Sequence, residues 1–302
     1  MGTALNRRQI LTGTAAALAS LGYGVYSQGQ ETAEKQRGKE GSAVREGRIR
    51  HSVVPWCFKP MPVEQLAHHA KALGIESVEL IDPKYFPLLQ ELGLTCAIGS
   101  SGLGFRFGLA NPAYEEKCLK ALRENIEHCS AFGVKRIITF SGMSEGIPQD
   151  VGLENMVKAV KKIIGLAEKK DVAICVEMLN TRVSETMKGH PGYMADSIEW
   201  CVELCQRVDS PHMKILFDIY HVQIMQGDII KRIREFHPYI GHYHTAGNPG
   251  RNELDDQQEI NYPAIMKAIV ESNYDGFVGH EFIPREENAV ESLRQAVKVC
   301  TV

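Results

Sequence analysis

The feature that most constrains the fold is an alternation of short apolar runs with longer amphipathic segments, from Arg48 to the C-terminus. The short runs are continuously apolar, which is typical of parallel strands buried on both faces. The longer segments carry apolar residues at helical spacing, and the first, 62–74, stops at a glycine. We therefore expect strands, each followed by a helix, at 49–56, 77–81, 94–100, 134–140, 172–178, 213–221, 240–244 and 277–282.

This number of strand–helix units, spread over about 250 residues, predicts an α/β fold of the (β/α)8 type, a TIM barrel. A doubly wound open sheet is the alternative, but no glycine-rich phosphate fingerprint follows the first strand. In a barrel, the carboxyl ends of all strands meet at one mouth, where active sites lie. Polar residues at strand ends are therefore the first candidates for function.

Acidic and basic residues are nearly balanced in number. Lys and Arg number 34 against 37 Asp and Glu, which leaves a net charge of −3. There is thus no electrostatic reason to expect a nucleic-acid partner. The eight cysteines form no CxxC pair, so we expect mostly unpaired thiols that act as small hydrophobes. The sequence leaves the oligomeric state open, with a homo-oligomer as one option.

The N-terminal 47 residues differ in composition from the rest. In 1–27, Arg7 and Arg8 precede an Ala-rich apolar run that is too short to span a bilayer. The segment resembles a twin-arginine export signal, with Asn6 where Ser or Thr is usual, and predicts a periplasmic protein. The alternatives are an uncleaved anchor and an ordinary basic helix on a cytoplasmic protein. We expect 28–47 to be a disordered linker and 48–302 to be the catalytic barrel.

Acidic and histidine residues end four successive predicted strands. Because a lone buried carboxylate is costly, residues that converge on one mouth favour a shared metal site. An oxygen-rich set with one imidazole favours Mn²⁺ or Mg²⁺, with Co²⁺ or Zn²⁺ as alternatives, over a structural zinc. The expected ligands are Glu177, Asp218, His244 and Glu281.

Several nearby residues have weaker assignments. His242 shares a strand face with His244, and we expect it either to contact substrate or to support the metal ligand. Glu79 is either a partner of a metal ligand or a salt bridge, and Trp56 either walls the pocket or packs in the core. The glycine-containing stretch 99–108 is predicted to be a flexible loop, and the acidic run Glu253–Glu259 a solvated one.

Four motifs are specific enough to indicate a family. They are VEMLNTR (176–182), FDIYHVQIMQGDI (217–229), AGNPGRNE with EINYPAI (246–265) and GFVGHEFIP (276–284). From about Arg48 onward the chain resembles the sugar isomerase/epimerase superfamily typified by xylose isomerase, and within it the hydroxypyruvate isomerase-like proteins.

The resemblance implies a metal-dependent isomerase that interconverts aldose and ketose forms of a sugar or keto acid through an enediolate. It implies that Glu177 and Glu281 are the acid–base pair as well as metal ligands. It also implies that Asp218 is a ligand and that His221 and Arg251 position substrate oxygens. A ketose 3-epimerase, or a lyase or dehydratase acting through the same enolate, is the alternative.

Two departures leave the substrate open. His244 stands where hydroxypyruvate isomerases usually have Gln and where ketose 3-epimerases have His. The loop NELDDQQEINY is longer than the family's usual glycine-containing loop. An endonuclease IV-like phosphodiesterase is disfavoured, because it needs more histidine ligands and a basic face.

Overall fold

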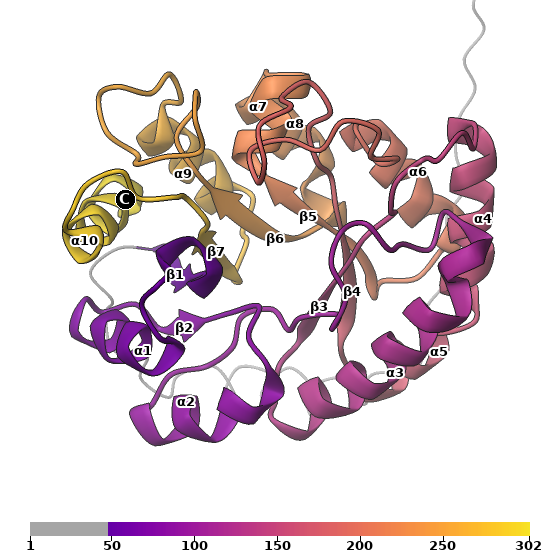
Figure 1. Cartoon of the computed structure of the whole chain (residues 1–302), viewed down its shortest axis with the longest axis horizontal. Coiled ribbons are helices and arrows are strands. Elements are labelled where there is room, and N and C mark those ends of the chain that lie inside the picture. Colours follow the sequence, from indigo (N-terminus) through magenta and orange to yellow (C-terminus); the bar gives the residue numbers. More distant parts are fainter. Residues whose placement is uncertain (1–47) are drawn as a thin grey trace, which may run out of the picture. The chain divides into compact units, whose positions relative to one another are not determined.

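Seven parallel strands curl around the centre of the molecule in the computed structural model, which describes residues 48–302 (Figure 1). The predictions for 1–27 and 28–47 lie outside the described residues. Along the sheet the strand order is β2-β1-β7-β6-β5-β4-β3. The strands are β1 (Arg50–Val53), β2 (Ser77–Val78), β3 (Arg136–Thr139), β4 (Ala173–Glu177), β5 (Met213–Asp218), β6 (Ile240–Thr245) and β7 (Phe277–His280).

The segment 94–100, predicted as a strand, has no regular strand structure. It lies between β2 and β3 and completes the eight positions around the barrel. Val78 N donates to Thr95 O on one side, and Ile138 N donates to Gly99 O on the other. The neighbouring β2 ends early, because Leu80 has a φ of 53° and leaves the extended conformation. The segment therefore closes the sheet through isolated bridges, and the fold is the predicted (β/α)8 barrel.

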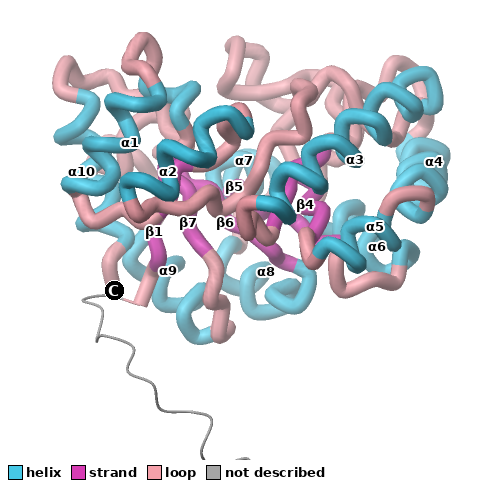
Figure 2. Tube along the Cα trace, turned by 90° about the horizontal axis from the view of Figure 1, so that it is seen from below, coloured by secondary structure: helices cyan, strands magenta, loops and turns pink. Residues whose placement is uncertain are grey.

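Helices surround the strands on the outside of the barrel (Figure 2). Among residues 48–302, none of them is long and apolar enough to cross a membrane. Their order along the chain is α1 (Val63–Ala72), α2 (Phe86–Leu92), α3 (Glu115–Ala131), α4 (Gln149–Lys161), α5 (Ile164–Lys170), α6 (Ile198–Val208), α7 (Ile219–Met225), α8 (Ile229–Phe236), α9 (Tyr262–Glu271) and α10 (Ala289–Cys300), with short 3-10 turns η1 (Pro55–Phe58), η2 (Pro83–Tyr85), η3 (Pro112–Tyr114) and η4 (His237–Tyr239).

One helix was not predicted, and it changes the position of a candidate residue. The predicted strand 213–221 ends at Asp218, whose carboxylate accepts hydrogen bonds from the backbone amides of Tyr220 and His221. These bonds cap the amino end of α7. His221 therefore lies in the first turn of a helix rather than at the end of a strand.

The cysteine prediction is confirmed. All eight thiols are unpaired and buried. Burial raises the pKa of Cys175 and of Cys205 to about 12, so neither forms a thiolate at neutral pH. These residues act as small apolar side chains.

The acidic loop after β6 is only partly solvated, which corrects the prediction for Glu253. Its side chain is 3% exposed, and its carboxylate accepts hydrogen bonds from the backbone amides of Arg285 (2.6 Å) and Glu286 (3.1 Å). The Ser292 hydroxyl donates a third bond, at 3.2 Å. Because these donors follow β7, far along the chain, the sequence pattern could not reveal them. Glu253 thus fastens the loop to the segment between β7 and α10.

We expect Glu253→Gln to lower the free energy of unfolding by about 1–3 kcal/mol at pH 7, because a buried cluster of donors loses its charged acceptor. Burial opposes ionisation, but the amides of Glu286 and Arg285 outweigh it and lower the pKa of Glu253. This stabilisation is full above the unfolded-state pKa of about 4.3 and is lost as the pH falls through the lower folded-state value. Thermal melts from pH 7 down to about pH 3 should show the gap from wild type narrowing once the pH falls below about 4.3. A gap that stays constant or widens in acid, or an equal effect of Asp256→Asn in the exposed part of the loop, contradicts the assignment.

Candidate active site

The structure brings the four expected metal ligands together at the mouth of the barrel. Glu177 ends β4, Asp218 ends β5, His244 lies in β6 and Glu281 follows β7. One ligand atom from each lies within 4.8 Å of the others, and all four side chains are buried. Because β4 to β7 are adjacent parallel strands, their carboxyl ends meet at one edge of the sheet.

The hydrogen bonds of His244 determine which ring nitrogen faces this cluster. Nε2 lies 2.7 Å from Glu79 Oε1, and Nδ1 lies 3.0 Å from Glu281 Oε2 and 3.8 Å from Glu177 Oε1. Burial opposes ionisation of Glu79, but His242 and His244 outweigh it and lower the pKa of that carboxyl. An ionised carboxylate only accepts, so Nε2 carries the proton and Nδ1 is the atom that can bind a cation.

His242 does not reach the cavity where we expected it to contact substrate. It precedes His244 by two residues on the same strand face and is fully buried, with Nε2 2.9 Å from Glu79 Oε1. Glu79 therefore accepts from both histidines. The adjacent Gly279 leaves room for this arrangement, since a Cβ there would lie 2.3 Å from Glu79 Oε1. The structure assigns His242 to the support of Glu79.

His221 presents a neutral N–H donor to the site. Its Nδ1 accepts a hydrogen bond from the backbone amide of Asn180 at 3.1 Å, which places the ring proton on Nε2. Nε2 has no hydrogen-bond partner within residues 48–302 and lies 3.6 Å from Asp218 Oδ2. Burial, together with the nearby Arg251, lowers the pKa of His221 well below its usual value. The ring therefore stays neutral at physiological pH.

Arg251 reaches back over the carboxylates from the loop after β6. Its guanidinium Nη2 lies 2.5 Å from Glu281 Oε2 and 3.4 Å from Asp218 Oδ2. The residue has a φ of 58°, and Ile283 N donates to its carbonyl, so the loop is held against the segment that follows β7. The side chain is 2% exposed. The loop therefore carries the Arg251 guanidinium to Glu281 and Asp218.

A cavity of about 230 Å³ opens onto this cluster. Trp56 walls it and donates its indole N–H to Glu281 Oε1 at 2.8 Å, so Trp56 has a polar contact in the site as well as packing. The loop 99–108 contributes Leu103, Gly104 and Phe105 to the wall. Glu177, Glu281 and Arg251 face the same space. This small cavity combines an apolar wall with charged groups.

His190 also lines the cavity, and sequence reasoning did not find it. It belongs to the loop between β4 and α6, away from any strand end, so neither position nor periodicity marked it. Its ring packs edge-on against Phe105, with 4.2 Å between ring centroids. Asn180 holds both histidines, because its backbone amide donates to His221 Nδ1 and its carbonyl accepts from the His190 amide.

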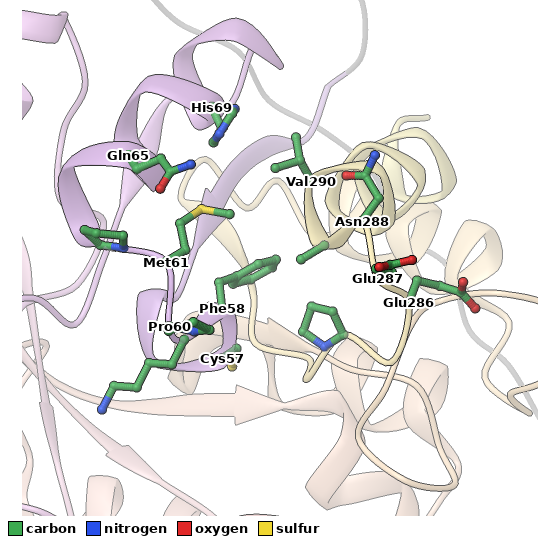
Figure 3. Close-up of a pocket in the computed structure, with 14 residues that line it drawn as sticks. Cys57, Phe58, Pro60, Met61, Gln65, His69, Glu286, Glu287, Asn288 and Val290 are labelled. Atoms are coloured by element: carbon green, nitrogen blue, oxygen red, sulfur yellow. The ribbon is translucent and has the colours of Figure 1, made fainter.

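A larger hollow of about 710 Å³ lies elsewhere, between η1, the start of α1 and the start of α10 (Figure 3). Its lining includes Phe58, Met61 and Val290, and two exposed acids, Glu286 and Glu287, at its edge. None of the candidate catalytic or metal-ligating residues lines it. The chemistry of this chain is therefore assigned to the smaller cavity.

The charge of the cluster fits a divalent cation. Burial raises the pKa of Glu177 and of Asp218, whereas Arg251 and His244 outweigh burial at Glu281 and lower its pKa. The three carboxylates face only one guanidinium, and Glu177 Oε1 is buried without a hydrogen-bond partner among the described residues. Three carboxylates with one imidazole nitrogen are an oxygen-rich set of donors that could hold a divalent cation.

Comparison with known proteins identifies the family that this fold and site define. The sequence model of the family described as xylose isomerase-like TIM barrel matches residues 67–299. The chain belongs to this family. It is 30% identical over 236 residues to the 2-oxo-tetronate isomerase of Cupriavidus necator, covering 72% of this chain and 85% of that protein. It is 28% identical over 178 residues to the hydroxypyruvate isomerase of Escherichia coli, covering 58% and 65% respectively.

Solved structures support the fold. A structure described as AP endonuclease, family 2, from Brucella melitensis superposes with a TM-score of 0.73 at 24% identity, covering 83% of this chain and 98% of that one. The D-psicose 3-epimerase of Clostridium cellulolyticum superposes with a TM-score of 0.68 at 18% identity, covering 84% and 100%. At these identities the superpositions establish the barrel alone.

Proposed function

We propose that this protein is a divalent-metal-dependent isomerase that interconverts the aldose and ketose forms of a small hydroxy-keto acid or sugar. The observation that carries the proposal is the cluster of Glu177, Glu281, Asp218 and His244, whose two glutamates line one small cavity. The relatives named 2-oxo-tetronate isomerase and hydroxypyruvate isomerase catalyse reactions of this class and support it.

The reaction needs two carboxylates next to a bound hydroxy-carbonyl group. Glu177, Asp218, His244 and Glu281 would hold a divalent cation, which would supply positive charge next to the substrate oxygens. One of the two glutamates removes the proton beside the carbonyl, and a carboxylate returns it to the neighbouring carbon. Since both glutamates line the cavity, they can reach a substrate that lies between them.

The remaining polar groups hold the substrate oxygens. The His221 Nε2–H has no partner among the described residues and can donate to a hydroxyl or carbonyl oxygen. Arg251 lines the cavity with a permanent positive charge, which suits a carboxylate or a polarised carbonyl. Trp56 excludes water from one side and fixes Glu281 through its indole N–H.

An epimerase is the second candidate, and His244 favours it, because the ketose 3-epimerases carry His at this position. In that case the proton returns to the opposite face of the same carbon. A lyase or dehydratase would use the same enolate but expel a β-substituent. The three reactions share the first proton transfer and differ in the product.

Deuterium exchange tests the shared step. The protein with Mn²⁺ should catalyse incorporation of solvent deuterium into at least one of hydroxypyruvate, 2-oxo-tetronate, a tetrulose or D-psicose. Product analysis then separates the alternatives. An isomer with the carbonyl on a different carbon supports the proposal. A C3 epimer supports the epimerase, and a product that has lost water supports the dehydratase. Absence of exchange across the panel refutes all three.

Metal addition should stabilise the fold measurably. A cation that binds only the folded state adds about 2.7 kcal/mol to the free energy of unfolding when its free concentration is 100 times its dissociation constant. We expect Mn²⁺ to raise the melting temperature of the wild-type protein and to do so far less for Asp218→Asn, which removes one ligand charge. An equal rise in both proteins would place the metal elsewhere.

A further inference from the structure

His190 is a buried polar group that the proposed reaction does not use. Its side chain is 5% exposed, and its Nδ1 has no hydrogen-bond partner among residues 48–302. A buried imidazole nitrogen usually has a partner, so a free one in a cavity wall points to a ligand atom. The ring lines the same cavity as Glu177 and Glu281.

The backbone around His190 holds the ring in a fixed place. The amide of His190 donates to Asn180 O at 2.8 Å, and its carbonyl accepts from Tyr193 N at 3.0 Å. Gly189, just before it, packs so closely that a Cβ would lie 2.1 Å from Val183 O. Phe105 closes on the ring from the opposite loop. The loop therefore presents the imidazole to the cavity in one orientation.

The ring of His190 lies beside His221, with 5.5 Å between the two ring centroids. Burial lowers the pKa of His190 to about 4, so the ring is neutral at physiological pH. A neutral imidazole offers one donor and one acceptor, as a hydroxyl group does, whereas a carboxylate only accepts. Arg251 is already available for a carboxylate or carbonyl. The substrate group that best matches the His190 imidazole is therefore a hydroxyl.

We propose that His190 is a specificity-determining residue that binds a hydroxyl on a carbon beyond the pair that exchanges its proton. This inference rests on the proposed function and makes hydroxy-keto acids or ketoses of at least four carbons its preferred substrates, with hydroxypyruvate turned over less efficiently. A three-carbon substrate such as hydroxypyruvate has no hydroxyl there. The cavity of about 230 Å³ is smaller than the roughly 300 Å³ typical of drug-sized ligands, so it suits one such metabolite rather than an oligosaccharide.

The test compares kcat/KM for two substrates in the His190→Leu variant. This substitution places an apolar side chain against Phe105 and removes both imidazole nitrogens. We expect kcat/KM for the extended substrate, 2-oxo-tetronate or the best ketose of the panel, to fall about tenfold or more, the loss of roughly one hydrogen bond. Hydroxypyruvate should change by less than about threefold. His190→Gln, which retains a donor and an acceptor, should recover part of the loss. Melting temperatures of both variants establish that they are folded.

Phe105→Leu is the matched control, because it alters the same wall without removing a polar group, and it should affect both substrates alike. Equal losses for both substrates in His190→Leu, or a wild-type protein active on hydroxypyruvate alone, overturn the role of His190 and leave the proposed function standing. A wild-type protein that exchanges protons with no substrate of the panel overturns the proposed function, and this inference with it.

Discussion

Replacing Glu177 or Glu281 with glutamine is expected to lower turnover by about 10²–10⁴-fold, the range typical of a lost general acid or base. Glutamine keeps the shape of the side chain but can neither accept the substrate proton nor return it. Both residues line the cavity, so each variant should also lose solvent deuterium exchange. The measurement is the rate of exchange and of product formation at saturating Mn²⁺, with metal binding followed by calorimetry.

The calorimetry matters because both glutamates are expected metal ligands. A variant that binds Mn²⁺ and still exchanges no proton places the defect in proton transfer. Glu271→Gln provides the control, since this glutamate is exposed on α9 and pairs only with Arg234 among the described residues. Full turnover in a folded Glu177→Gln variant contradicts the assignment of this residue and favours a site that binds sugars without chemistry.

Replacing Glu79 is expected to have the largest effect on stability. In Glu79→Leu, the two buried Nε2–H groups of His242 and His244 lose their common acceptor, at 2.9 and 2.7 Å. Removing one partner of a buried charged network costs about 3–5 kcal/mol. Because His244 would lose the bond that orients it, we also expect the Mn²⁺ affinity to fall about 10- to 100-fold. Urea denaturation and calorimetric titration measure the two effects separately.

Two further variants isolate the cause. Glu79→Gln restores the shape and one acceptor, so its Mn²⁺ affinity should lie between those of wild type and Glu79→Leu. Glu76→Gln removes a half-exposed carboxylate three residues away, paired with Arg50 at 3.1 Å, and a surface pair contributes only about 0–1 kcal/mol. Unchanged metal binding in Glu79→Leu would show that His244 is oriented by other contacts.

The extent of sequence-based prediction differed between the strands and the site. The strand positions and the barrel followed from the pattern of apolar residues, because a strand that is buried on both faces has a continuously apolar sequence. The segment 94–100 failed as a regular strand because its form depends on Leu80, where β2 leaves the extended conformation. His221 was misplaced because the side chain of Asp218 caps a helix within the predicted strand.

The barrel and the four candidate ligands could be inferred from the sequence, since parallel strands bring residues at their carboxyl ends to one mouth. Which atoms meet there depends on the folded chain. Glu79 joins His242 across 163 residues, and Glu253 joins Arg285 across 32. His190 lines the cavity because of the way its loop folds. Such contacts form between segments whose local patterns carry no information about each other, so they appear only when the chain is folded.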